Sequence, residues 1–385
     1  MRSVYFDSAA TTQLRPEVAE RMFEVLRDVP GNPSSTHAYG RSAKSLVENA
    51  RKTIAGYLNV SAGEIIFTSG GTEADNLAIS CAVRDLGVQR IITSKIEHHA
   101  VLHATEYAAK QYGATLDYVN LKDCGTPDDI HLEALLSENR GKTLVSLMHV
   151  NNEVGNMIDV KAIATLCKKY DALYHSDMVQ SIGHFKVNLQ EIPVDFVAAA
   201  AHKFHGPKGI GFAFVRKNSG LRPLIHGGGQ ERGLRAGTEG VHNIVGMEKA
   251  MQIAYDNLEE EREYVEGLKT YFCERLQNEI SGIKLNGNCA FNDKSTYTLL
   301  NVGLPVSTEK ALMLLFQLDM KGIACSKGSA CQSGSDKGSH VLSAMLSEED
   351  LLKPSIRFSF STFNTREEID YVMGVLKEFL EVPVN

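Results

Sequence analysis

The sequence predicts an α/β protein with two domains: a large domain built on a mostly parallel sheet, and a smaller α+β domain. Short apolar runs alternate with helical patterns over the first two thirds of the chain, which is typical of a parallel sheet covered on both faces. The charge pattern changes near Glu248, and a chain of 385 residues usually divides into two domains. We place the large domain at residues 14–250 and the small domain at residues 1–13 and 251–385.

The large domain opens with a helix and continues as strands separated by helices. Residues 16–26 carry an apolar stripe at helical spacing that begins with a proline. Further helices are expected at 76–83 and 160–170. Short apolar runs predict strands at residues 64–68, 90–93, 143–148, 172–175, 196–199 and 210–215. Ligands of such sheets bind at the carboxyl ends of the strands, so the residues that follow these runs are the candidates for chemistry.

The small domain is predicted from a long helix and two weaker strands. Residues 251–277 form an amphipathic pattern rich in glutamate and arginine, which we interpret as one helix. Strands are expected at 296–302 and 356–360, with helices at 309–318 and 367–380. The sequence contains no internal repeat and no low-complexity linker.

Composition excludes several classes of protein. The net charge is −7 and the chain has no lysine- or arginine-rich block, which argues against direct nucleic-acid binding. No apolar stretch reaches the roughly 18 residues of a membrane span, and we expect no signal peptide. The seven scattered cysteines indicate reduced thiols rather than a disulfide framework, so we expect a cytoplasmic enzyme.

Lys203 and Asp177 together indicate a pyridoxal phosphate site. Lys203 follows an apolar run and precedes a glycine-punctuated segment, and Asp177 follows the apolar run before it. In such a site the carboxylate pairs with the pyridinium nitrogen and the lysine holds the aldehyde as an imine. The alternative is a surface lysine beside a turn, which is the usual place of an isolated lysine. The neighbouring candidates His98 and Gly71 favour the cofactor site.

A phosphate loop and a histidine follow two of the earlier strands. Gly71 and Thr72 join a strand to a helix, where free amide groups can bind a phosphate; the alternative is a glycine turn with a threonine cap. His98 can stack on a planar cofactor and move protons near neutral pH. Its alternative is a polar surface or helix-start histidine, and a zinc pair with His99 is disfavoured because adjacent histidines point in different directions.

Amide side chains and a glycine-rich segment extend the candidate site. Asn152 and Gln180 can hydrogen-bond the cofactor's ring hydroxyl, and Asn152 can also contact a substrate carboxylate; turn formation is the alternative for Asn152. Residues 226–238 are glycine-rich and contain Arg232 and Arg235, which suits close approach to an anion. The alternative for this segment is a flexible surface loop.

Cys331 lies in a glycine- and serine-rich segment, residues 322–335, which predicts an exposed, mobile loop. An exposed cysteine beside Lys327 has an accessible thiolate, and Cys325 places a second thiol in the same segment. The spacing of the two cysteines does not suit a zinc site. Arg357 lies inside an apolar run, where it is expected to pair with a carboxylate, plausibly that of the substrate.

These motifs resemble the cysteine desulfurases, the NifS/IscS-like group of fold-type I pyridoxal phosphate enzymes in the class V aminotransferase superfamily. The resemblance runs nearly end to end and is carried by YFDSAATT at 5–12, GNPSS at 31–35, EH at 97–98, HVNNE at 149–153, AHK at 201–203, GSAC at 328–331 and SIRF at 355–358. It implies a cofactor site made of Lys203, His98, Asp177, Asn152, Gln180, Gly71, Thr72 and His202. Thr238 would reach the phosphate from the partner subunit of a homodimer.

The resemblance also implies the reaction. Arg357 and Asn152 would bind the substrate L-cysteine, and Cys331, in a loop at about 322–338, would take its sulfur as a persulfide and leave L-alanine. A sulfur-acceptor protein in iron–sulfur cluster or thio-cofactor synthesis would then receive the sulfur. The resting enzyme would hold no metal, with Cys331 as a transient iron–sulfur ligand. Alternatives are a selenocysteine lyase, a cysteine sulfinate desulfinase, another class V enzyme, or an inactive regulatory homologue.

Overall fold

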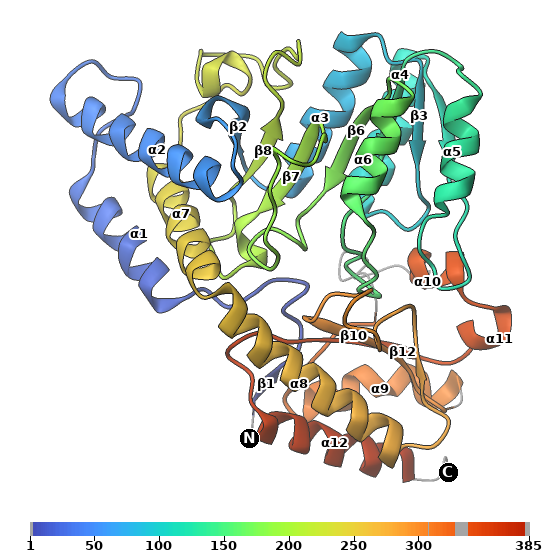
Figure 1. Cartoon of the computed structure of the whole chain (residues 1–385). Helices are drawn as coiled ribbons and strands as arrows, with labels where there is room; N and C mark the ends of the chain where they lie inside the picture. Colours follow the sequence, from blue (N-terminus) through green and yellow to red (C-terminus); the bar gives the residue numbers. More distant parts are fainter. Residues whose placement is uncertain (1–2, 307, 328–337, 382–385) are drawn as a thin grey trace.

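A seven-stranded sheet forms the centre of the larger part of the molecule (Figure 1). The computed structural model describes residues 3–306, 308–327 and 338–381. The strand order is β2-β8-β7-β6-β5-β3-β4; the pairs from β4 to β7 are parallel, and β8 and β2 are added antiparallel. The strands are β2 (Ile65–Thr68), β3 (Arg90–Thr93), β4 (Thr115–Tyr118), β5 (Thr143–Ser146), β6 (Leu173–Asp177), β7 (Phe196–Ala200) and β8 (Gly211–Val215). The predicted mostly parallel sheet is confirmed.

Helices cover both faces of this sheet. One face packs against α1 (Pro16–Asp28), α2 (Ala38–Tyr57), α5 (Asp129–Ser137), α6 (Val160–Lys169) and α7 (Val241–Asp256), and the other against α3 (Gly71–Leu86) and α4 (His99–Tyr112). Successive strand residues alternate between the two cores: Ile65 and Phe67 belong to the first, and Ile66 to the second. A strand that is buried on both sides reads as a continuous apolar run, which is why the sequence shows these strands clearly.

A smaller unit joins the two ends of the chain. Its three-stranded antiparallel sheet pairs β10 (Leu299–Gly303) with β12 (Ser355–Ser359) and β9 (Lys284–Leu285), and its parallel pair joins β1 (Val4–Tyr5) to β11 (Ile323–Ala324). The helices of this unit are α8 (Leu258–Glu279), α9 (Thr308–Met320), α10 (His340–Met345), α11 (Glu348–Leu351) and α12 (Arg366–Glu381). Val4 and Phe6 pack in the same core as α8 and α12. The predicted boundaries at 14–250 and 251–385 stay a prediction.

Two expectations about local structure were wrong. The helix expected over 251–277 is two helices, α7 and α8, separated at Asn257 (Figure 1). The Asn257 side chain donates to the carbonyl of Ile253 at 2.9 Å, and asparagine competes in this way with helix continuation. The segment 322–335 does not begin as an exposed loop, because Ile323 and Ala324 pair with Val4 and Tyr5 as strand β11.

Three short 3-10 turns connect the main elements, at Ala62–Glu64, Ala201–Lys203 and Glu231–Gly233. The second follows β7 directly and carries the predicted lysine. None of the helices in the described part of the chain combines the length and the apolar composition that a membrane span requires.

The buried ion pair between Arg51 and Glu231 fixes the glycine-rich segment to the large sheet. Two hydrogen bonds of 2.6 and 2.9 Å join the guanidinium to the carboxylate, and both side chains are only 2% exposed. Glu231 also accepts from the amide of Phe67 at 2.8 Å, and the guanidinium lies 4.5 Å from the centre of the Phe67 ring. Arg232 pairs with Glu48 at 3.4 Å. This segment is therefore held in place, unlike a flexible surface loop.

We predict that Glu231→Ala destabilises the protein by about 3 kcal/mol or more, because it leaves a buried guanidinium without its partner. Glu48→Ala is the matched control: Glu48 also pairs with Arg51 but is 35% exposed, so its loss should cost less than about 1 kcal/mol. Urea unfolding followed by tyrosine fluorescence measures both. Equal losses in the two variants would contradict the assignment of the buried pair as a structural constraint.

Candidate active site

A cavity of about 260 Å³ lies at the carboxyl ends of the central strands. Its wall is formed by Ala9, Ala10, Gly71, Thr72, Asp75, His98, Met148, Val150, Asn152, Asp177, Val179, Gln180, Ala200, His202, Lys203 and Arg357. Every predicted site residue in the described part of the chain lies in this wall except Thr238. Asp177 ends β6, and Lys203 closes the turn that follows the neighbouring strand β7. Parallel pairing of β6 with β7 thus brings the two residues to one edge of the sheet.

Lys203 points its amine toward the N-terminal segment. Its Nζ donates to the carbonyl oxygens of Ala9 at 2.6 Å and Ala10 at 2.8 Å. His184 binds the Lys203 carbonyl with its Nε2 at 2.8 Å and so supports the turn from the other side. These contacts hold a primary amine at the wall of the cavity.

Asp177 is a buried carboxylate with a positive partner close by. Its Oδ1 accepts from the amide of Val179 at 2.8 Å. Burial is the main cause, and the Asp75 carboxyl the second, of a pKa of about 7 for Asp177; His175 and Lys203 act in the opposite direction. A cation placed against Asp177 would relieve the cost of burying its charge. The site therefore fits a protonated ring nitrogen.

A second buried acid lies behind Asp177 and was not found from the sequence. Asp75 Oδ1 lies 3.3 Å from Nε2 of His175, whose Nδ1 is 2.8 Å from the Ser146 hydroxyl. Burial holds the pKa of Asp75 well above its usual value and lowers the pKa of His175 to about 4. The signal was present in the spacing: Asp75 lies one helical turn after Gly71, and His175 two strand positions before Asp177.

The start of α3 forms the anion-binding end of the cavity. At Gly71 a Cβ atom would come within 2.6 Å of Val179 Cγ2, so only glycine leaves this space open. Gly71 and Thr72 are the first residues of a 16-residue helix, whose free amide groups favour an anion. His202 binds the Thr11 hydroxyl with Nδ1 at 3.2 Å, and burial lowers its pKa to about 4, with further lowering by Lys203 and Lys208. This end of the cavity fits a phosphate group.

His98 enters the cavity from the start of α4. Its Nδ1 accepts from the amide of Ala100 at 3.2 Å, which leaves the proton on Nε2. Burial lowers the pKa of His98 to about 4, and the nearby charge of Lys203 lowers it further. The ring is thus uncharged at neutral pH, which differs from the expected titration near neutrality but suits stacking on a planar cofactor.

Arg357 is paired with a carboxylate that the sequence did not identify. Its Nη2 donates to Asp7 at 2.8 Å and its Nη1 to the carbonyl of Asn152 at 2.7 Å. Its Nε is buried and has no hydrogen-bond partner among the described residues. The expected carboxylate partner is therefore Asp7 in this structure, and Nε is the donor left for a ligand. Gln180 donates to the carbonyl of Ala9 at 3.0 Å, which keeps its amide in the same wall.

The predicted anion site on the glycine-rich segment is occupied by the chain's own carboxylates. Arg235 binds Glu73 at 2.9 Å, and Arg232 binds Glu48. Thr238 lies outside the main cavity and lines a separate one of about 160 Å³ together with Arg235 and Ser69. Within one chain, Thr238 is therefore not part of the cofactor cavity.

Of the two cysteines in the expected loop, the structure describes Cys325 but not Cys331. Cys331 lies outside the described residues. Cys325, the second thiol of the segment expected to be an exposed loop, follows β11 and is only partly exposed; burial, together with the nearby Asp7 carboxylate, raises its pKa to about 12. Within the ranges that the structure covers, no cluster of histidine, cysteine and acidic side chains is arranged to hold a metal.

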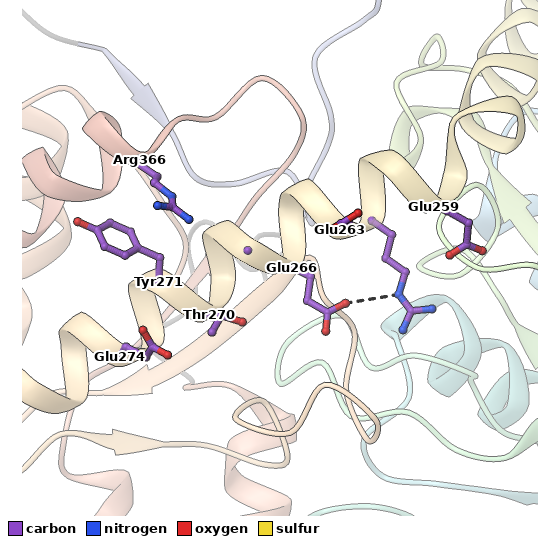
Figure 2. Close-up of a pocket in the computed structure, with 9 residues that line it drawn as sticks. Glu259, Glu263, Glu266, Thr270, Tyr271, Glu274 and Arg366 are labelled. Carbon is purple, nitrogen blue, oxygen red and sulfur yellow. Dashed lines mark ion pairs between the residues drawn. The ribbon is translucent and has the colours of Figure 1, made fainter.

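A larger and shallower hollow lies on the surface of α8 (Figure 2). Glu259, Glu263, Glu266 and Glu274 line it together with Arg262 and Arg366. Arg262 pairs with Glu266 at 3.5 Å, one helical turn away. None of the predicted site residues lies in this hollow, and its charges are those of a solvated helix face.

Comparison with known proteins identifies the family. Residues 4–372 match the model of the aminotransferase class-V family, and the chain belongs to it. A relative named cysteine desulfurase IscS, from Dictyoglomus turgidum, is 40% identical over 99% of this chain and 95% of its own length. A solved NifS-like protein superposes with a TM-score of 0.87 at 37% identity, covering 98% of this chain and 99% of that one. Within the class-V family, the chain is a cysteine desulfurase.

A further solved structure is informative about the ligand of a relative. It is described as SspA in complex with cysteine, with a TM-score of 0.81 and 32% identity, and covers 94% of this chain and all of that one. Family members depend on pyridoxal phosphate, so this chain is a pyridoxal phosphate enzyme. The acid, amine and anion-binding ends of the cavity described above fit that cofactor.

We predict that Asp177→Asn makes the apoprotein more stable than the wild type, and that this difference in stability increases as the pH rises. A buried carboxyl with a pKa near 7 contributes stability below the unfolded-state pKa of about 3.9 and loses it as pH rises through 7. The asparagine cannot ionise, so its advantage over the wild type should grow by about 3 kcal/mol from pH 5 to pH 8. Thermal unfolding of apoprotein at both pH values tests this, with the exposed Asp123→Asn as control. An advantage independent of pH would show that Asp177 does not ionise in the empty site.

Proposed function

We propose that this enzyme converts L-cysteine to L-alanine at the cavity of Lys203 and carries the released sulfur as a persulfide on Cys331. The observation that supports these assignments is the shared cavity: Lys203 and Asp177 follow neighbouring strands, and Arg357 lies in the same wall. The residues have the chemistry that the family reaction requires, namely an amine for an aldehyde, an acid for a ring nitrogen and a guanidinium for a carboxylate.

The cofactor residues divide into three groups in this proposal. Gly71, Thr72 and His202 hold the phosphate, and Asp177 holds the ring nitrogen in its protonated form. The Lys203 amine would hold the cofactor's aldehyde. Pyridoxal phosphate supplies an electron-withdrawing ring that lowers the energy of negative charge on the substrate's α-carbon. His98 lies against the ring as an uncharged imidazole, and Asn152 and Gln180 contribute hydrogen bonds.

The substrate is held by its carboxylate and attacked at its sulfur. Arg357 Nε is the free buried donor that a substrate carboxylate can bind, and Asn152 lies beside it. The Cys331 thiolate would attack the cysteine sulfur: a sulfur–sulfur bond forms, the bond from the sulfur to the β-carbon breaks, and its electron pair stays with the β-carbon. Protonation of that carbon gives alanine. Lys203 and His98 are the candidates for the proton transfers, since both lie in the cavity wall.

We also propose that the persulfide sulfur passes to an acceptor protein of iron–sulfur cluster assembly or thio-cofactor synthesis. Cys331 must be a free thiol to accept sulfur, so a cytoplasmic location, where thiols are kept reduced, is part of this proposal. The six cysteines of the described chain are all free, which agrees with such a compartment.

We predict that Cys331→Ser abolishes alanine release from L-cysteine while borohydride still fixes pyridoxal phosphate to Lys203. The serine hydroxyl cannot accept sulfur, whereas the cofactor site is untouched. Cys325→Ser is the matched control and should retain most activity, because that thiol is buried and protonated. Alanine assay and peptide mass spectrometry of cysteine-treated protein measure the outcome. A persulfide on Cys325 in the wild type would reverse the two assignments, and no alanine at all would contradict the function.

We predict a homodimer in which Thr238 completes the site of the partner subunit. Lys203→Ala and Thr238→Glu should each be inactive, the second because its carboxylate repels the phosphate. If Thr238 acts across the dimer, a mixed dimer has one intact site, and random pairing should restore about a quarter of the wild-type activity. Activity after subunit exchange, with light scattering to count subunits, tests this. Mixed dimers that form but stay inactive would place Thr238 in its own subunit's site.

A further inference from the structure

Two neighbouring residues of the small sheet bind successive carbonyls of a loop in the cavity wall. Asn301 of β10 lies directly opposite Arg357 of β12 in the antiparallel pair, so both side chains leave the same face of that sheet (Figure 1). Arg357 Nη1 donates to the carbonyl of Asn152 at 2.7 Å. Asn301 Nδ2 donates to the next carbonyl, that of Glu153, at 2.9 Å. Asn301 therefore binds the same stretch of backbone as the guanidinium that the proposed function assigns to the substrate.

The loop that receives these two bonds comprises residues 150–157 and closes on itself. Val150 and Met157 form an antiparallel bridge at its base. Val150 and Asn152 both line the cavity. Asn152 and the residue after it lie near the middle of the loop, away from the bridge, so the base alone does not fix them. The bonds from the small sheet hold the loop at this point.

Asn301 is held in one orientation by a second asparagine. Its Oδ1 accepts from Nδ2 of Asn286 at 2.8 Å, and the same Nδ2 donates to the Ser355 hydroxyl at 3.0 Å. Asn301 is fully buried, and Asn286 is nearly so. Because a backbone carbonyl can only accept, the Asn301 amide must turn its Nδ2 toward Glu153. A buried amide that is paired at both ends forms a rigid link between β10 and the loop.

The Arg357 guanidinium depends on the position of this loop. Its Nη2 donates to Asp7 at 2.8 Å and its Nη1 to the Asn152 carbonyl. Its buried Nε has no hydrogen-bond partner within the described ranges of the chain. The donors of a guanidinium have a fixed planar geometry, so a shift of either anchor turns the group and redirects Nε. The backbone at Asn152 therefore sets the direction from which Arg357 can bind a carboxylate.

We propose that Asn301 is a positioning residue for carboxylate recognition: by holding the Glu153 carbonyl, it fixes the adjacent Asn152 carbonyl and thus the orientation of Arg357. This inference rests on the proposed function, because it takes Arg357 as the group that binds the carboxylate of L-cysteine. Asn301 is not among the described residues that line the cavity, so it acts on the substrate through the loop. Its loss should weaken the binding of amines that carry a carboxylate and spare the binding of amines that do not.

The test compares two buried asparagines of the small unit. Asn301→Ala removes the bond to Glu153. Asn364→Ala is the matched control, because Asn364 is 2% exposed and its Nδ2 also donates to a backbone carbonyl, that of Tyr5, at 3.0 Å. The visible absorbance of the holoenzyme follows the binding of L-alanine and of ethylamine, which is alanine without its carboxylate. Asn301→Ala should weaken L-alanine binding about fivefold, as expected for one hydrogen bond, and ethylamine binding less than about twofold. Asn364→Ala should change both by less than about twofold.

Steady-state kinetics provide a second readout. Asn301→Ala should raise KM for L-cysteine about fivefold and change kcat less than about twofold, because the carboxylate contact is the same in the ground state and the transition state. Urea unfolding of the apoprotein shows whether each variant folds. If Asn301→Ala does not fold, Asn301→Leu takes its place with Asn364→Leu as control, since leucine keeps the side-chain volume but has no donor.

Equal effects of the Asn301 and Asn364 variants on L-alanine binding would overturn the inference. So would a loss of ethylamine binding in Asn301→Ala as large as the loss of L-alanine binding. Failure of the proposed function has a different signature, which Arg357→Gln reveals. If that variant still prefers L-alanine to ethylamine, Arg357 is not the carboxylate-binding group. If it loses the preference while Asn301→Ala keeps it in full, only the role of Asn301 is overturned.

Discussion

The burial of Asp177 at the end of β6 is the constraint on which the site depends. A carboxylate in this position is costly unless a cation lies against it, and the neighbouring strand β7 delivers Lys203 to the same edge. In the proposed function, the protonated ring nitrogen of the cofactor would be a further cation beside Asp177. Burial of the ionised Asp177 therefore lowers the stability of the empty protein and would raise its affinity for a positively charged ring, because the cation offsets the cost of burying the carboxylate.

The groups around Asp177 add little charge of their own at neutral pH. His98, His175 and His202 each have a pKa of about 4 because they are buried, so none adds a positive charge at neutral pH. Asp75, held above its usual pKa by burial, is a second acid that favours its protonated form. The wall thus contains many polar groups but few charged ones, and its electrostatic potential depends mainly on Asp177, Lys203, Arg357 and the start of α3.

The sequence predicted the sheet and most of the cavity because both depend on local patterns. Strands buried on two faces appear as apolar runs, and their carboxyl ends carry the cavity residues, so order along the chain gave the location of Lys203 and Asp177. The partners that were missed come from distant segments. Asp7 reaches Arg357 from 350 residues away, so no local spacing connects that pair. Asp75 and His175 are each spaced to share a face with a predicted site residue, but no local pattern pairs the two with each other.

The incorrect expectations for Cys325, Arg232 and Arg235 also arise from contacts with residues that are distant in the sequence. Cys325 reads as an exposed loop thiol from its glycine and serine neighbours, but pairing of Ile323 and Ala324 with the first strand buries it. Arg232 and Arg235 read as anion-binding side chains, yet Glu48 and Glu73 neutralise them. In each case the residue type suits the expected role, but a contact with a distant part of the chain, which the local sequence does not reveal, buries or neutralises the side chain.

The N-terminal segment shows how the small unit and the cavity are joined by one short stretch of chain. Val4 and Phe6 pack in the core of the small unit, while the carbonyls of Ala9 and Ala10 accept from Lys203. Asp7, between them, binds Arg357. The two hydrogen bonds of the Lys203 amine therefore connect the cavity wall to the same short stretch of chain that packs in the small unit.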